Sequence, residues 1–186
     1  MGKTTFSGPV RSIAGFSPDG WGNIVSHPHT ETTLALTAAE HGGRWISLTG
    51  DHSLVATLPE INATDPIDDT APGQSCNFGL TFRMIISNTI TSLTLKTATG
   101  DEFFGGLTIN TESNVTALSG ATWFALDGDG YNTLTIDSAL TGWEPGGILE
   151  VFATPAGTAE QHRWNVSKSH LLGVGDVGAA TPFSVV

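Results

Sequence analysis

Apolar and polar residues alternate in a series of short runs along most of the chain. In the clearest run, Phe78, Leu80, Phe82, Met84 and Ile86 occupy every second position. Alternation with period two predicts a strand that turns one face to a core. Shorter runs of the same kind lie near residues 45–49, 53–58, 92–96, 107–109, 123–126, 134–136 and 164–166.

Residues 148–153 are apolar on both faces except at Glu150. A strand that is apolar on both faces is typical of the middle of a sheet, so we predict a central position for it. Turn sequences rich in glycine, proline and aspartate separate the runs. Strands at this spacing predict an all-β domain over residues 44–186, an antiparallel β-sandwich or a jelly-roll-like barrel.

Residues 1–43 differ, because glycine and proline interrupt them too often for a helix or strand period. Large apolar residues occur singly between these breaks. We therefore predict an extended N-terminal arm and lead-in. The arm lies either on its own domain or on a partner surface. Residues 32–41 within it are compatible with a strand or a short helix.

The charge of the chain limits its partners. The 186 residues include 18 acidic and 7 basic side chains, a formal net charge of −11. Such a surface repels nucleic acid phosphates and anionic lipid, so we expect neither as a partner. No apolar run is long enough for a transmembrane helix, and residues 1–6 lack the apolar stretch of a secretory signal. The single cysteine, Cys76, excludes an internal disulfide.

Histidines supply the first candidate chemistry. His27 and His29 are spaced to place two imidazoles on one side of an extended chain. A metal site would need a further ligand such as His41, Glu31 or Glu40, and two incidental histidines in a polar arm are the alternative.

The run 51–53 (Asp-His-Ser) holds the three residue types of a catalytic triad. A triad is built in space and not by adjacency in sequence. No nucleophile elbow, zinc-protease motif or phosphate loop is found. We therefore expect no enzyme activity and no cofactor.

Acidic positions supply the second candidate chemistry. Residues 127–132 (DGDGYN) alternate carboxylates as calcium loops do, but Ser138 stands where the bidentate glutamate should be. We therefore favour a plain hairpin and expect no metal. We also interpret the pair Asp101 and Glu102 as loop charge.

Among the five tryptophans, Trp143 is flanked by glycine and turn residues and is expected to be the most exposed. An exposed tryptophan can stack on sugar rings, whereas a buried tryptophan fills a hydrophobic core or an interface. A receptor- or glycan-binding module that uses Trp143 or Trp123 and the acidic loop 127–132 is therefore an alternative function.

Several segments, taken in order, resemble capsid decoration (cement) proteins of tailed bacteriophages. These segments are MGKTTFSGPVRS at residues 1–12, residues 77–86, residues 92–106, DGDGYN at 127–132, RWNV at 163–166 and TPFS at 181–184. The resemblance implies a homotrimer on the outer surface of a virion capsid, in contact with the major capsid protein. It implies an accessory structural function that stabilises the capsid by clamping neighbouring subunits.

The arm is the predicted capsid contact. Its first 26 residues contain two basic side chains and one acidic side chain, Asp19, whereas the remainder of the chain is strongly acidic. This asymmetry favours an acidic partner surface with apolar pockets. The predicted contact residues are Lys3, Phe6, Val10, Arg11, Ile13 and Phe16.

Overall fold

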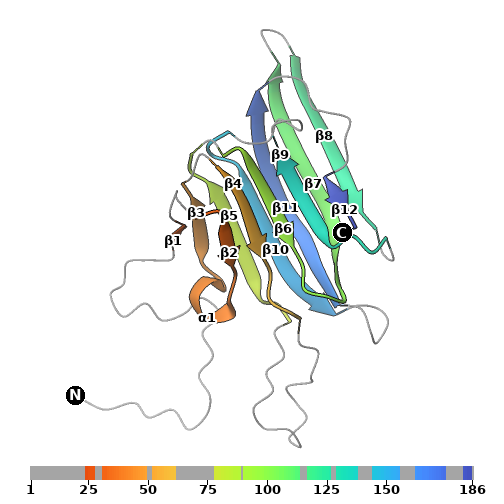
Figure 1. Cartoon of the computed structure of the whole chain (residues 1–186). Helices are drawn as coiled ribbons and strands as arrows, with labels where there is room; N and C mark the ends of the chain where they lie inside the picture. Colours follow the sequence, from red (N-terminus) through yellow and green to blue (C-terminus); the bar gives the residue numbers. More distant parts are fainter. Residues whose placement is uncertain are drawn as a thin grey trace, which may run out of the picture.

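The computed structural model describes ten segments of the chain. These segments are residues 24–27, 31–49, 52–61, 78–88, 90–113, 117–126, 129–137, 144–155, 162–174 and 182–185. Nearly all of them belong to two β-sheets that face each other (Figure 1). The predicted all-β sandwich is therefore confirmed.

The larger sheet has seven strands. In spatial order they are β1 (Ile24–His27), β3 (Trp45–Leu48), β5 (Thr81–Ile86), β10 (Ile148–Pro155), β11 (His162–Val174), β7 (Asp101–Ser113) and β8 (Ala117–Ala125). The strand β10 is the fourth of seven, so its predicted central position is confirmed.

The smaller sheet has five strands and covers one face of the larger sheet. In spatial order they are β12 (Phe183–Ser184), β9 (Thr133–Asp137), β6 (Ser92–Lys96), β4 (Ser53–Thr57) and β2 (Thr33–Ala35). A single helical turn in the described segments, α1 (Ala38–His41), begins at Thr37, whose hydroxyl accepts a hydrogen bond from the Glu40 amide.

The sheets are mixed, which corrects the expectation of a purely antiparallel sandwich. The chain alternates between sheets from β1 to β6, so each strand returns to its own sheet running in the same direction. As a result β1, β3 and β5 pair in parallel, and so do β2, β4 and β6. Antiparallel pairing dominates later, as in β10 with β5 and β7 with β8.

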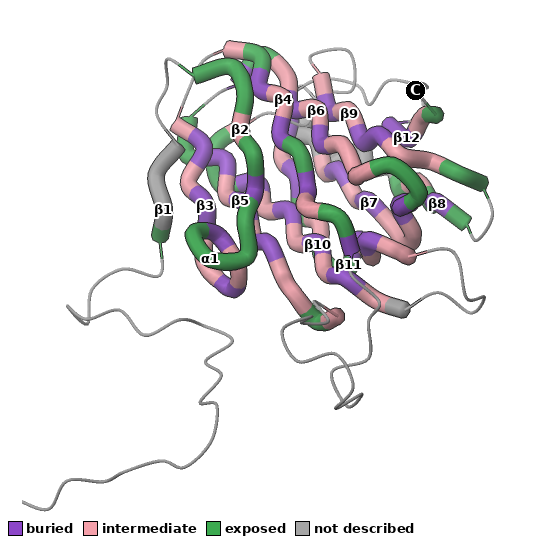
Figure 2. Tube along the Cα trace, turned by 60° about the horizontal axis from the view of Figure 1, so that its bottom comes forward, coloured by how far each residue is buried: buried purple, intermediate pink, exposed green. Residues whose placement is uncertain are grey.

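The core lies between the two sheets, where buried positions alternate with half-buried or exposed ones along each strand (Figure 2). The apolar residues Phe82, Met84 and Ile86 of the predicted strand are all buried on the core side. Aromatic rings fill the middle, with Phe82 and Trp164 centred 5.5 Å apart. Burying each large side chain contributes roughly 1.5–3 kcal/mol to folding.

The β domain begins earlier than the predicted boundary at residue 44. Strands β1 and β2 and helix α1 fall within the expected lead-in, yet both strands pair with strands of the two sheets. Residues 32–41 contain both of the structures considered for them, a strand followed by a helical turn. No helix in the described segments is long and apolar enough to cross a membrane.

The predicted loop charges Asp101 and Glu102 are instead buried, at 5% and 4% exposure, where β7 begins. The carboxylate of Asp101 accepts a hydrogen bond from the Ile61 amide at 3.0 Å. The Glu102 carboxylate forms an ion pair with Arg163 Nε at 3.1 Å. Their acidity marked them as surface residues, but each has a specific partner that permits burial.

Candidate binding surfaces

A row of large side chains crosses the outer face of the seven-stranded sheet, away from the core. The sheet register pairs Trp45 with Arg83, Arg83 with Glu150, and Glu150 with Lys168. Residues paired in this way lie side by side on one face of a sheet. The register thus brings together four residues that are far apart in the sequence.

A β-bulge at Ser167 sets the position of this row on β11. The register passes from Val151 opposite Val166 to Glu150 opposite Lys168, which leaves Ser167 as an extra residue. Ser167 and Lys168 are consequently both exposed, although they are consecutive. A bulge turns side chains in a way that regular alternation does not allow.

The same bulge interrupts pairing between β11 and β7, and a side chain bridges the interruption. Backbone pairing stops after Val166 and resumes at Leu171. Between these points the Ser169 hydroxyl accepts a hydrogen bond from the Thr108 amide at 2.7 Å and donates one to the Gly106 carbonyl at 3.3 Å. The Ser169 side chain therefore satisfies two β7 backbone groups that the bulge leaves without their ladder partners.

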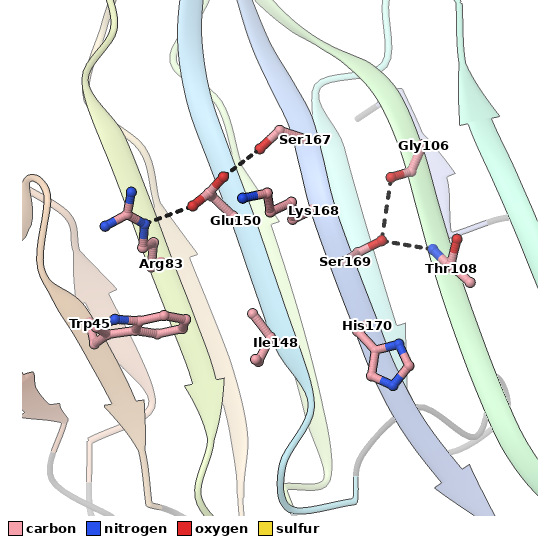
Figure 3. A pocket seen from close by; sticks show the side chains of 10 residues that line it. All are labelled: Trp45, Arg83, Gly106, Thr108, Ile148, Glu150, Ser167, Lys168, Ser169 and His170. Carbon is pink, nitrogen blue, oxygen red and sulfur yellow. Dashed lines mark hydrogen bonds and ion pairs between the residues drawn. The ribbon is translucent and has the colours of Figure 1, made fainter.

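An ion pair organises the centre of the row. Glu150 accepts hydrogen bonds from Arg83 Nε at 2.7 Å and from the Ser167 hydroxyl at 2.8 Å (Figure 3). Burial alone would raise the pKa of Glu150, but these two bonds and the charges of Arg83 and Lys168 hold that pKa below its usual value. Glu150 is therefore ionised at neutral pH and fixes the orientation of Arg83.

These residues enclose a groove of about 600 Å³. That volume falls within the ~300–1,000 Å³ typical of small-molecule sites. Ten residues from five strands line it: Trp45, Arg83, Gly106, Thr108, Ile148, Glu150, Ser167, Lys168, Ser169 and His170 (Figure 3). We refer to this site as the outer groove.

A second surface lies at the side of the sandwich where both sheets end in β8 and β12. Both views place these two strands on the same side (Figures 1 and 2). Four large apolar residues are strongly exposed in the described segments, and Phe124, Leu126 and Val185 lie in or next to these edge strands. Their exposed fractions are 61–65%. We refer to this surface as the β8–β12 side.

The sequence-predicted arm contacts lie outside the described residues. This applies to Lys3, Phe6, Val10, Arg11, Ile13 and Phe16. Their proposed capsid contact therefore stays a prediction.

The histidine candidates do not converge on a site in the part of the chain that is described. His41 is buried and its Nδ1 accepts a hydrogen bond from the Thr37 amide at 3.1 Å, whereas the ring of His52 donates to the carbonyl of Glu31. Within the described segments, no three His, Cys, Asp or Glu side chains are grouped closely enough to hold a metal ion. Residues His29 and Asp51 lie outside those segments.

The acidic turn and the tryptophans can be placed in part. The Asp129 carboxylate accepts a hydrogen bond from the Leu126 amide at 2.9 Å. The hairpin predicted for residues 127–132 is wrong, because β8 pairs with β7 whereas β9 pairs with β6 and β12, so the segment connects strands of different sheets. Asp127 and Trp143 lie outside the described residues. Trp123 is half-buried and packs against the core.

Sequence reasoning missed the outer groove, although one signal pointed to it. The apolar residues Trp164 and Val166 are two positions apart, as on one face of a strand, but Leu171 is an odd number of positions further on. In a regular strand Leu171 would face the other way, so this spacing indicates a bulge between Val166 and Leu171.

Comparisons with protein-family models, curated proteins and solved structures give no match to this chain.

Proposed function

We propose that this protein is an accessory virion structural protein that decorates the outer surface of a phage capsid. In this role it assembles as a homotrimer and clamps neighbouring subunits of the major capsid protein against internal pressure. The ordered resemblance of its segments to capsid decoration proteins supports the proposal. The acidic β-sandwich fold is compatible with it.

The β8–β12 side is the observation that carries the proposal. An edge strand presents backbone groups that can pair with another chain, and proteins that stay monomeric protect such edges with charge, proline or short length. The strand β8 is nine residues long and ends in the sequence Trp-Phe-Ala, with Phe124 exposed near its end and Leu126 exposed directly after it. An apolar edge of this kind favours contact with another subunit.

The arm supplies the proposed contact with the capsid. Burying each of its apolar side chains would contribute roughly 1.5–3 kcal/mol of binding free energy. Three arms on one trimer would act together, because binding of the first arm raises the effective concentration of the other two. Weak individual contacts would then give a stable attachment.

A copy count on purified virions tests the function directly. A decoration protein is present in hundreds of copies, whereas a receptor-binding fibre protein is present in few. Deletion of residues 1–20 should leave the melting temperature nearly unchanged and lower capsid binding by at least ~10²-fold. Normal decoration by the truncated protein would refute the arm contact, and its unfolding would place the arm in its own core.

The assembly surface is tested by Leu126→Glu, which places a charge on the β8–β12 side. Light scattering should show a trimer for the wild type and a shift towards monomer for this variant. The matched control is Thr57→Glu, an exposed position on β4 in the interior of the smaller sheet. A monomeric wild-type protein at micromolar concentration, free and on the particle, would count against the proposal.

A further inference from the structure

We propose that the outer groove is a binding site for an acidic saccharide, a short stretch of sugar rings that carry carboxylate groups. This inference is independent of the proposed capsid role, because it concerns a surface on the outer face of the seven-stranded sheet. Three observations carry it: an aromatic wall, a local excess of positive charge, and a row of hydroxyl and imidazole groups.

Trp45 forms the aromatic wall. Its indole lies on the outer face beside Arg83, and it is half-buried, so one part of the ring system packs on the protein and another borders the groove (Figure 3). A held aromatic ring offers a flat apolar surface at little cost in side-chain entropy. The C–H face of a sugar ring is a ligand surface that matches it.

Positive charge distinguishes the groove from the protein around it. Only seven lysines and arginines occur in a chain of net charge −11, and Arg83 and Lys168 both line this groove. Among the described residues that line the groove, Glu150 is the one carboxylate, and it is already engaged by Arg83 Nε and Ser167. The groove lining thus carries a formal excess of one positive charge.

The geometry of Arg83 favours a carboxylate ligand. Glu150 holds the guanidinium through Nε, while its two terminal nitrogens point away from Glu150 (Figure 3). The Arg83 side chain is 38% exposed. A guanidinium held in a fixed orientation is suited to paired hydrogen bonds with a planar carboxylate. Lys168 and His170, on β11 beyond β10, can contact further polar groups of the same ligand.

The chemistry favours a saccharide over a polyphosphate. A nucleic acid strand would extend beyond the groove across the surface of a strongly acidic protein, which opposes its binding. A short saccharide has spaced charges and many hydroxyl groups. The side chains of Thr108, Ser167 and His170 provide hydrogen-bonding groups of matching polarity along the groove.

Calorimetric titration of the purified full chain with a short oligogalacturonate tests the site. The same oligosaccharide with its carboxylates methyl-esterified is the paired ligand, because it keeps the rings and removes the charge. We expect binding of the acid form, with affinity that falls as salt is raised, and at least about tenfold weaker binding of the ester. A sulfated oligosaccharide distinguishes carboxylate recognition from general anion binding.

Two variants locate the binding. Lys168→Gln changes an exposed side chain in the groove and should weaken the acid form about tenfold. Lys96→Gln on the smaller sheet is the matched control and should leave affinity unchanged. Trp45→Ala should weaken both acid and ester forms, since stacking does not depend on the carboxylate. Circular dichroism checks that each variant is folded.

Several results would overturn the inference. These are no binding of the acid form at millimolar concentration, equal affinity for acid and ester, or equal loss in Lys168→Gln and Lys96→Gln. Binding of tripolyphosphate or a single-stranded oligonucleotide as tightly as the oligogalacturonate would also overturn it, since the groove would then be a general anion site. None of these outcomes bears on virion copy number, so the two proposals fail separately.

Discussion

Replacing Asp101 with asparagine should stabilise the protein at neutral pH and have little benefit in acid. Burial raises the pKa of the Asp101 carboxyl from its ordinary value of 3.8 to about 6, and the nearby charge of Glu60 acts in the same direction. The hydrogen bond from the Ile61 amide and the charge of His162 oppose this rise without cancelling it. The folded protein therefore holds this proton more tightly than the unfolded chain does.

The direction of the pH effect follows from that difference. Because the folded pKa is raised, the contribution of Asp101 to stability is fully present below about pH 4 and is lost as pH rises through about 6. A shift of this size corresponds to a penalty on the order of 2–3 kcal/mol for keeping the ionised carboxylate buried at neutral pH. Asparagine is neutral at every pH and retains an oxygen that can accept from the Ile61 amide.

Urea unfolding of wild type and Asp101→Asn at a series of pH values measures this penalty. The free energy of unfolding of the variant minus that of the wild type should rise by roughly 2–3 kcal/mol between about pH 4 and pH 8. Comparing the difference between two proteins removes the titration of groups that they share. Asp129→Asn is the matched control. Like Asp101, the Asp129 carboxylate accepts a hydrogen bond from one backbone amide, but Asp129 is exposed.

A difference that stays constant across the pH range would refute the reasoning, because it would mean that burial does not perturb Asp101. A difference that falls with rising pH would mean that hydrogen bonding and the His162 charge outweigh burial. Following the Asp101 carboxyl carbon by NMR would give its folded pKa directly. A value near 4 would contradict the expectation by an independent route.

Other predictions concern the region where β7 begins and the absence of a metal. Gly105→Ala should lower the free energy of unfolding by roughly 2–4 kcal/mol, because φ is +106° there and an added Cβ would lie 2.6 Å from the Val166 carbonyl oxygen. The neighbouring Gly106→Ala is the control and should cost below about 1 kcal/mol. Urea unfolding measures both. Glu102→Gln should lower the free energy of unfolding by roughly 3–5 kcal/mol at neutral pH, the range typical of removing one partner of a buried ion pair. A loss below about 1 kcal/mol would show that solvent or other contacts compensate for the lost pair. Adding EDTA should leave the melting temperature unchanged, and a loss restored by calcium would contradict the expectation that residues 127–132 bind no metal.

The strands were predictable because their signal is local. Alternation in residues 78–86 and the two-sided apolar run in residues 148–153 depend on side chains within one strand, and both are seen in β5 and β10. The pairing direction of the strands was not predictable in this way. Parallel pairing of β1, β3 and β5 depends on which sheet each strand joins, and that choice is made by packing between distant segments.

The prediction that Asp101 and Glu102 are exposed loop residues was wrong because each carboxylate has a partner inside the protein. Asp101 and Glu102 have the composition of a turn, but their carboxylates meet Ile61 and Arg163, which lie 40 and 61 residues away in the sequence. No local pattern records such a contact. The lead-in near residues 24–41 was misjudged for a related reason, since its short strands are held by pairing with β3 and β4 more than by their own sequence.

The outer groove shows how a small irregularity in one strand can create a site. Regular alternation along β11 would turn one of the neighbours Ser167 and Lys168 towards the core, and the bulge leaves both exposed beside Glu150. The bulge also interrupts the ladder with β7, and the Ser169 hydroxyl satisfies the backbone groups on the far side of that interruption. Gly106 and Thr108 extend the lining of the groove onto β7. The odd number of residues that separates the core-facing Val166 from the core-facing Leu171 is therefore the feature of the sequence that relates most directly to the proposed saccharide site.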